Sequence, residues 1–138
     1  MGPTPWTLLH DALVVGLVRR GGDVDVQVSA PHLASRFDRS CERFVLRLVG
    51  TQRFTYRPYG DDSLAIDEFE AIVRAAPQLV EAVIEGDDVV IWGSRGSLRL
   101  SYSSATIHLE SGAEVSVDQL ESVVTEYWRE WRARHPRT

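Results

Sequence analysis

A histidine and an aspartate stand side by side at positions 10 and 11, directly before the first apolar run of the sequence. A carboxylate beside an imidazole raises the pKa of the imidazole and orients it for proton transfer. Neighbouring residues of a strand point to opposite faces, so His10 and Asp11 act together only on a turn. The structural alternative is that Asp11 accepts hydrogen bonds from backbone amides at the strand start while His10 packs on a tryptophan.

His108 and Glu110 form a second pair, two residues apart in an alternating run, so both point to one face of a strand. An imidazole and a carboxylate are a minimal acid–base or metal pair, but a metal site needs further ligands. His32, in a long loop, is a possible third group, although the spacing does not demand it. The alternative is that His108 and Glu110 belong to a solvated face, and we assign no catalytic residue and no metal ligand.

Arginines line a third candidate site. Arg53 and Arg57 share one face of a strand with Thr55, and Arg99 would join them from a neighbouring strand. Guanidinium groups in such an arrangement bind anions. The alternative is a set of ion pairs with carboxylates of the chain, namely Asp23, Asp25 or Glu110.

Several sites with clear sequence signatures are absent from the chain. The sequence contains no glycine-rich phosphate loop before a helix, no nucleophile elbow and no paired cysteines or histidines with zinc spacing. It therefore calls for no cofactor. The single cysteine, Cys41, excludes an internal disulfide, fits a reducing compartment and is expected to be a small buried apolar residue.

The charge of the chain is unevenly distributed. The formal net charge is −5, and residues 61–121 hold three arginines against thirteen acidic residues, about −10. This acidic segment argues against a nucleic-acid partner and is compatible with a basic protein. The alternative is an acidic surface that keeps the protein in solution. The residues assigned to partner binding are Asp61, Asp62, Glu81, Glu85, Asp87 and Asp88.

The spacing of apolar residues predicts four consecutive strands over residues 79–110, joined by short turns. Strict alternation predicts a buried face shared with the strand at residues 23–30. The residues expected on this face are Val24, Val26, Val28, Leu98, Leu100, Ile107 and Leu109.

The remaining segments predict three more strand regions and two helices. The strand at residues 12–19 is apolar on both faces, which suits the middle of a sheet or a position under a helix. Residues 44–49 and 53–57 are expected to form two strands around Gly50 or one bent strand with a bulge, and residues 31–43 a loop with or without a helical turn. A helix begins near Asp67, with Glu70 in the capping-box position, and ends at Pro77.

The last helix begins at Ser116, with Gln119 in the capping-box position, and carries a wide apolar stripe. The stripe favours a core position for Trp128 and Trp131, unless Trp131 overhangs the sheet edge.

Together these elements predict one α+β domain over residues 1–138, with residues 1–6 and 135–138 loose. We expect one curled antiparallel sheet of seven to eight strands, with both helices packed on its apolar face. The chain has no apolar run that would cross a membrane and no secretory signal, so we expect a cytoplasmic protein, either a monomer or a dimer.

Two segments resemble a known group of proteins. The run Leu9-His10-Asp11-Ala12 before an apolar strand, and VLRLVGTQRFTYRPYG at residues 45–60, are similar to small bacterial domains of unknown function. Some such domains are regarded as toxin-immunity proteins. The resemblance implies a non-enzymatic inhibitor of a basic toxin and no catalytic residues.

Two alternative functions remain at this point. The first is a small-ligand protein or an enzyme with a cleft between sheet and helices, and the second is a module that dimerises through a sheet edge. The residues assigned to the alternative cleft are His10, Asp11, His108, Glu110 and Arg99.

Overall fold

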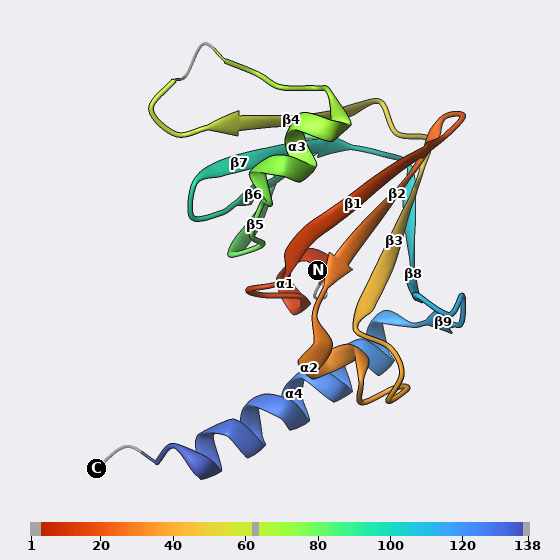
Figure 1. The fold of residues 1–138 in the computed structure, drawn as a ribbon, viewed down its shortest axis with the longest axis vertical. Helices are drawn as coiled ribbons and strands as arrows, with labels where there is room; N and C mark the ends of the chain where they lie inside the picture. The colour runs from red at the N-terminus through yellow and green to blue at the C-terminus, as the bar shows by residue number, and fades with distance from the viewer. Residues whose placement is uncertain (1–3, 62–63, 137–138) are drawn as a thin grey trace.

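The computed structural model of the protein describes residues 4–61 and 64–136 (Figure 1). The fold is α+β with antiparallel sheets, as expected, but it has two sheets rather than one. Within the described residues the elements follow in this order: α1 Pro5–Leu8, β1 Leu13–Arg20, β2 Asp23–Ser29, α2 Pro31–Ala34, β3 Arg43–Val49, β4 Arg53–Pro58, α3 Phe69–Ala75, β5 Glu81–Glu85, β6 Asp88–Trp92, β7 Gly96–Ser101, β8 Ser104–Leu109, β9 Glu114–Val115 and α4 Val117–Arg134.

The five-stranded sheet has the order β1-β2-β3-β8-β9, and the four-stranded sheet has the order β4-β7-β6-β5. The chain passes from one sheet to the other twice, after β3 and after β7. Both passages lie at one bend, where the Ser103 amide donates to the Val49 carbonyl at 2.8 Å. The two sheets splay apart from this bend (Figure 1). The four predicted strands of residues 79–110 exist, but β8 belongs to the other sheet.

Gly50 makes the bend possible. Its φ of +64° lies in the left-handed region, and a Cβ at this position would stand 2.7 Å from the Ser103 hydroxyl. A residue with a side chain would therefore be strained here, and the Ser103 hydroxyl would have to move.

The core lies between the two sheets. All seven residues predicted for the buried face are buried, and they belong to one hydrophobic cluster. Strand register produces this face, because Val26 pairs with Leu46 across β2 and β3, and Leu46 pairs with Ile107 across β3 and β8. The alternation in the sequence predicted which side chains are buried, although they come from two sheets.

Strand β1 lies at an edge of the five-stranded sheet rather than in its middle. Helix α3 packs against it, and the Arg19 guanidinium lies 4.6 Å from the centre of the Phe69 ring. The predicted capping box of this helix is wrong, because Glu68 is the N-cap residue and makes no side-chain capping bond. The helix ends as predicted before Pro77, with Ala76 in the left-handed conformation.

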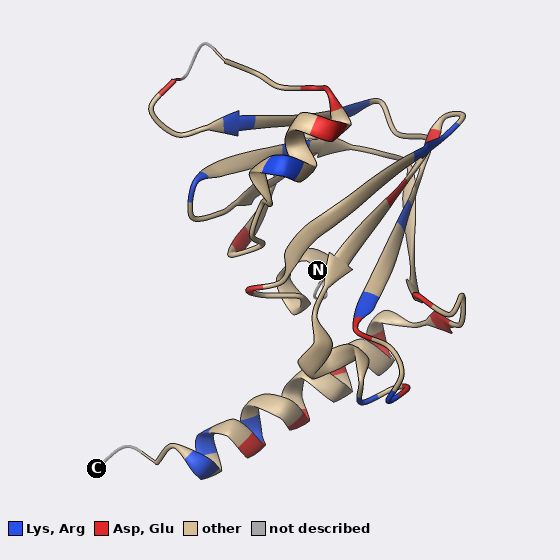
Figure 2. Ribbon diagram, viewed as in Figure 1, with Lys and Arg blue, Asp and Glu red and all other residues tan. Residues whose placement is uncertain are grey.

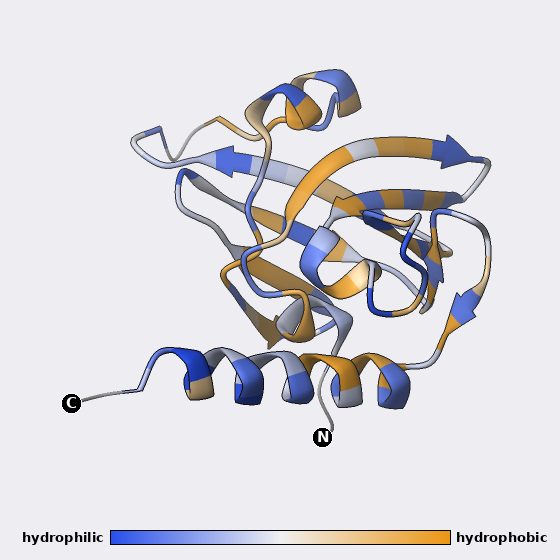
Figure 3. Cartoon of the chain, turned by 60° about the horizontal axis from the view of Figure 1, so that its bottom comes forward, coloured by the Kyte–Doolittle hydropathy of each residue, from blue (hydrophilic) through white to orange (hydrophobic). Residues whose placement is uncertain are grey.

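Helix α4 has the predicted capping box, since the Gln119 amide donates to the Ser116 hydroxyl at 3.1 Å. The helix does not pack on a sheet face, however. It contacts α1 and α2, and its second half extends away from both sheets (Figures 1 and 3). As a result Leu120 is fully buried, Trp128 is half-buried and Trp131 is 38% exposed. The expected core position of the two tryptophans is therefore wrong.

The N-terminal arm is anchored from residue 4 onward. Trp6 is buried, and its indole nitrogen donates a hydrogen bond of 2.8 Å to the Tyr102 hydroxyl. At the other end, the His135 ring stacks on Trp131 with 4.2 Å between ring centres. Residues 4–6 are thus part of the fold rather than a loose arm, whereas the expectation for residues 135–138 stays a prediction; residues 1–3 and 137–138 lie outside the described residues. No helix among those described is both long and apolar enough to span a membrane.

Candidate functional site

The His10–Asp11 pair lies on an exposed turn between α1 and β1. The His10 Nδ1 lies 2.7 Å from the Val80 carbonyl oxygen, and its Nε2 lies 3.4 Å from an Asp11 carboxylate oxygen. Because a carbonyl only accepts hydrogen bonds, Nδ1 carries the proton of that bond. Asp11 has a φ of +68°, and its amide donates to the Leu79 carbonyl at 2.7 Å. The pair thus ties this turn to the segment that leads into β5.

The second predicted pair is not assembled. The His108 Nε2 lies 2.9 Å from the Thr106 hydroxyl, whereas Glu110 accepts hydrogen bonds from the backbone amides of Glu42 and Arg43. Glu110 therefore anchors the loop before β3. His32 lies elsewhere, with its ring centre 4.8 Å from that of Tyr127, and burial lowers its pKa.

The predicted arginine cluster exists on the outer face of the four-stranded sheet, but its ion-pair partner was wrongly expected. Asp88 accepts hydrogen bonds from Arg53 at 2.7 Å and Arg99 at 2.8 Å. The hydrogen bond from Arg99 is the main reason why the pKa of Asp88 is lowered. Arg57 forms no ion pair with any carboxylate in residues 4–61 and 64–136.

The residues of the alternative cleft therefore lie in separate places. His10 and Asp11 are on a turn, His108 and Glu110 belong to β8 and its end, and Arg99 belongs to the other sheet. No hydrogen bond or ion pair among the described residues joins these three groups. No group of three histidine, cysteine or acidic residues in the described part of the chain could hold a metal ion.

The acidic residues assigned to partner binding also separate. Glu81, Glu85 and Asp87 are exposed on the β5–β6 hairpin, where Figure 2 shows acidic residues at the turn. Asp88 is held by its two arginines, with a side chain only 14% exposed. Asp61 lies on the exposed loop after β4, and Asp62 lies outside the described residues.

Exposed apolar side chains gather on the same hairpin and next to it. Among the described residues ten large apolar side chains are exposed, and five of them lie here, namely Tyr59, Val80, Val83, Ile84 and Trp92. The Trp92 ring stacks against Tyr59, with 6.4 Å between ring centres. Strand β5 is the last strand of its sheet, and beyond β6 no strand in the described part of the chain pairs with it.

We call the exposed side chains of this hairpin the hairpin edge; they belong to Glu81, Val83, Ile84, Glu85, Asp87 and Trp92. Sequence analysis identified its acidic residues and missed its apolar ones. The available signal was that Val83 and Ile84 are neighbours and so point to opposite faces of one strand. An edge strand that is apolar on both faces leaves apolar area uncovered.

No protein-family model, no curated protein and no solved structure matches this chain.

Proposed function

We propose that this chain is a non-enzymatic protein-binding domain whose hairpin edge receives an extended, basic segment of a partner protein. The supporting observation is the coincidence of three features on one strand. Strand β5 has no pairing strand on its outer side among the described residues, it exposes 39% of Val83 and 50% of Ile84, and acidic residues flank it.

An unpaired edge strand presents backbone donors and acceptors that an extended peptide can satisfy by adding a strand. The side chains of Val83 and Ile84 would then be covered on both faces of the new strand pair, which favours association.

The charge of the hairpin edge defines the chemistry of the occupant. Glu81, Glu85 and Asp87 attract a segment rich in arginine or lysine. A second copy of the chain is disfavoured, because pairing two β5 strands edge to edge brings acidic side chains together. The resemblance of residues 9–12 and 45–60 to immunity-type domains supports the more specific proposal that the partner is a basic toxin, which this domain inhibits.

The test uses the protein encoded beside this chain in its genome as the binding probe, because immunity proteins are paired with the toxins they inhibit. Association rates are measured over a salt series for the wild type and for the double variant Glu81→Lys, Glu85→Lys. The matched control is Glu121→Lys, Glu126→Lys, which makes the same charge change at two exposed positions of α4. Asp88 is left intact, since it holds Arg53 at 2.7 Å and Arg99 at 2.8 Å. Glu85 lies farther from Arg99, at 3.6 Å, and its side chain is 53% exposed, so Arg99 keeps its main partner in the variant.

We expect association of the wild type to slow as salt rises, because electrostatic steering raises association rates by about 10- to 1,000-fold at low salt. The Glu81, Glu85 variant should associate at least about tenfold more slowly at low salt, and the control variant at the wild-type rate. Amide hydrogen exchange of residues 81–85 should slow in the complex. A probe that does not bind, a rate that is flat in salt, or equal rates for the two variants would each overturn the proposal.

A further inference from the structure

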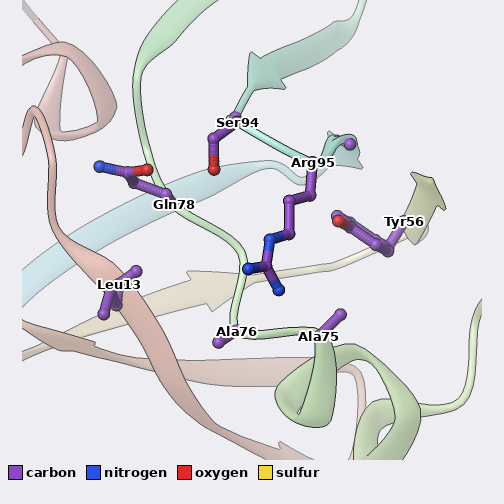
Figure 4. A pocket seen from close by; sticks show the side chains of 9 residues that line it. Leu13, Tyr56, Ala75, Ala76, Gln78, Ser94 and Arg95 are labelled. Atoms are coloured by element: carbon purple, nitrogen blue, oxygen red, sulfur yellow. The ribbon is translucent and has the colours of Figure 1, made fainter. Parts of the chain in front are cut away.

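A cavity of about 260 Å³ opens where four elements meet, and it shares no residue with the hairpin edge (Figure 4). Tyr56 reaches it from β4, Leu13 from β1, and Ala75 and Ala76 from the end of α3. The turn between β6 and β7 supplies Ser94 and Arg95. The volume is below the roughly 300–1,000 Å³ of pockets that hold drug-sized ligands, so it suits a smaller molecule.

The Tyr56 side chain is the most informative group in this cavity. Tyr56 is only 3% exposed, yet its hydroxyl makes no hydrogen bond to any of the described residues. Figure 4 shows this hydroxyl turned toward the Arg95 side chain. Burial is the largest cause of the raised pKa of Tyr56, so the hydroxyl keeps its proton at neutral pH and can donate it. Within residues 4–61 and 64–136 no buried side-chain nitrogen or oxygen lacks a hydrogen-bond partner, so the unbonded Tyr56 hydroxyl is open to the cavity. It is therefore free to donate a hydrogen bond to a molecule that enters the cavity.

Gly96 explains how the phenol reaches the cavity. A Cβ at Gly96 would stand 2.5 Å from the Tyr56 hydroxyl and 2.6 Å from the Arg57 carbonyl. Only glycine leaves room for the ring to lie over β7. The position of the Tyr56 hydroxyl is therefore fixed by the packing of the sheet.

Arg95 supplies the charge of the cavity. Its side chain extends into the cavity in Figure 4 and forms no ion pair or hydrogen bond with a side chain of the described residues. The turn that carries it is held in place, because the Gly93 amide donates to the Gly96 carbonyl at 2.8 Å and the Tyr59 amide donates to the Arg95 carbonyl at 2.9 Å. Such preorganisation lowers the entropy that binding would otherwise cost.

The remaining lining residues suggest which anion fits. The Ser94 hydroxyl points into the cavity beside Arg95, whereas Leu13, Ala75 and Ala76 present an apolar wall (Figure 4). Gln78 stands at the rim, and its amide nitrogen lies 3.3 Å from an Asp11 carboxylate oxygen. One guanidinium matches one negative charge, and its planar fork matches the two oxygens of a carboxylate.

We propose that this cavity binds a small organic monocarboxylate. The carboxylate contacts the Arg95 guanidinium and the hydroxyls of Tyr56 and Ser94, and a short apolar tail lies against Leu13, Ala75 and Ala76. The alternative is that Arg95 serves only to stabilise the C-terminal end of α3.

The test is a titration of the ¹⁵N-labelled full chain with butyrate, followed by two-dimensional NMR. The uncharged analogue butyramide and inorganic phosphate are titrated in parallel. We expect butyrate to shift the amides of residues 75, 76, 78 and 93–96 in a saturable way. Titration to about 50 mM would nearly saturate a site with a Kd of about 1 mM.

Three variants locate the binding. Arg95→Gln should weaken butyrate binding at least about tenfold, because it removes a charge-assisted contact. Tyr56→Phe should weaken it about two- to tenfold and leave the midpoint of thermal unfolding unchanged, since the hydroxyl has no partner inside the protein. The matched control is Arg57→Gln, an exposed arginine of the same sheet, which should bind butyrate like the wild type.

Several results would overturn the proposal. These are the absence of saturable shifts, equal shifts with butyramide, tighter binding of phosphate than of butyrate, or equal weakening by Arg57→Gln and Arg95→Gln. An Arg95→Gln variant that loses stability while butyrate binding is unchanged would show that Arg95 only stabilises α3. None of these outcomes bears on the hairpin edge, whose test uses a protein probe and other residues.

Discussion

The two sheets of the protein each hold one aspartate between two arginines on the outer face. In the five-stranded sheet, Asp25 lies 2.8 Å from Arg20 and 2.9 Å from Arg47, and only 5% of its side chain is exposed. In the four-stranded sheet, Asp88 lies 2.7 Å from Arg53 and 2.8 Å from Arg99. An aspartate that pairs with two arginines thus links strands in both sheets.

The sheets differ in the charge beside the exposed apolar side chains of their edge strands. Strand β1 exposes Leu13 and Val18 and ends in Arg19 and Arg20, whereas β5 exposes Val83 and Ile84 between Glu81 and Glu85. An exposed apolar edge marks an interaction surface, and the charge beside it selects the partner. The difference teaches why we propose the hairpin edge, rather than β1, as the surface for a basic partner, while the core that stabilises the fold is built from both sheets.

The largest expected effect separates the core from the hairpin edge. Leu46→Ala, at a fully buried position of β3, should lower the free energy of unfolding by about 2–5 kcal/mol. Ile84→Ala on β5 should lower it by less than about 1 kcal/mol, because half of that side chain is already exposed. Denaturant unfolding measures both values. Equal losses would show that the hairpin edge is as tightly packed as the core.

A smaller effect is expected at the aspartate of the five-stranded sheet. Asp25→Asn should lower the free energy of unfolding at pH 7 by about 1–3 kcal/mol, since it removes charge-assisted bonds to two arginines at a buried position. Chemical denaturation at pH 7 provides the measurement, and a wild-type value would contradict the prediction.

The same variant should change the pH dependence of stability. Hydrogen bonding from Arg47 is the first cause of the lowered pKa of Asp25 in the folded protein. A group with a lowered folded pKa stabilises the fold above its unfolded pKa of about 3.9, and this contribution is lost as pH falls through the folded value. The wild type should therefore lose stability below about pH 4, and Asp25→Asn should lose less over that range.

A further small effect is expected outside both sheets, on the projecting half of α4. Trp128 is half-buried, and its ring contacts are with Tyr127 and Trp131 of the same helix. Trp128→Ala should therefore lower the free energy of unfolding by less than about 1.5 kcal/mol. A loss as large as that of Leu46→Ala would show that the second half of α4 is covered by other parts of the protein in solution.

The sequence by itself determined the local features of this protein. Alternation placed Val26 and Ile107 in the core, because a period of two fixes which side chains share a face. The residues Ser116 and Gln119 predicted the start of α4, since both partners of a capping box lie within four residues. The acidic character of residues 81–87 was also evident, because charge depends on composition alone.

Only the tertiary structure decided what depends on distant segments. The chain changes sheets where Gly50 lies against Ser103, and nothing local to either residue specifies the other. The apolar stripe of α4 predicted a buried helix, but the stripe does not show how much of the helix the rest of the chain covers. The first turns are covered at Leu120, whereas Trp131 is 38% exposed. The cavity at Tyr56 brings together β1, β4, α3 and the β6–β7 turn. The sequence could not predict this cavity, because its polar side chains come from separate segments and only the folded chain brings them together.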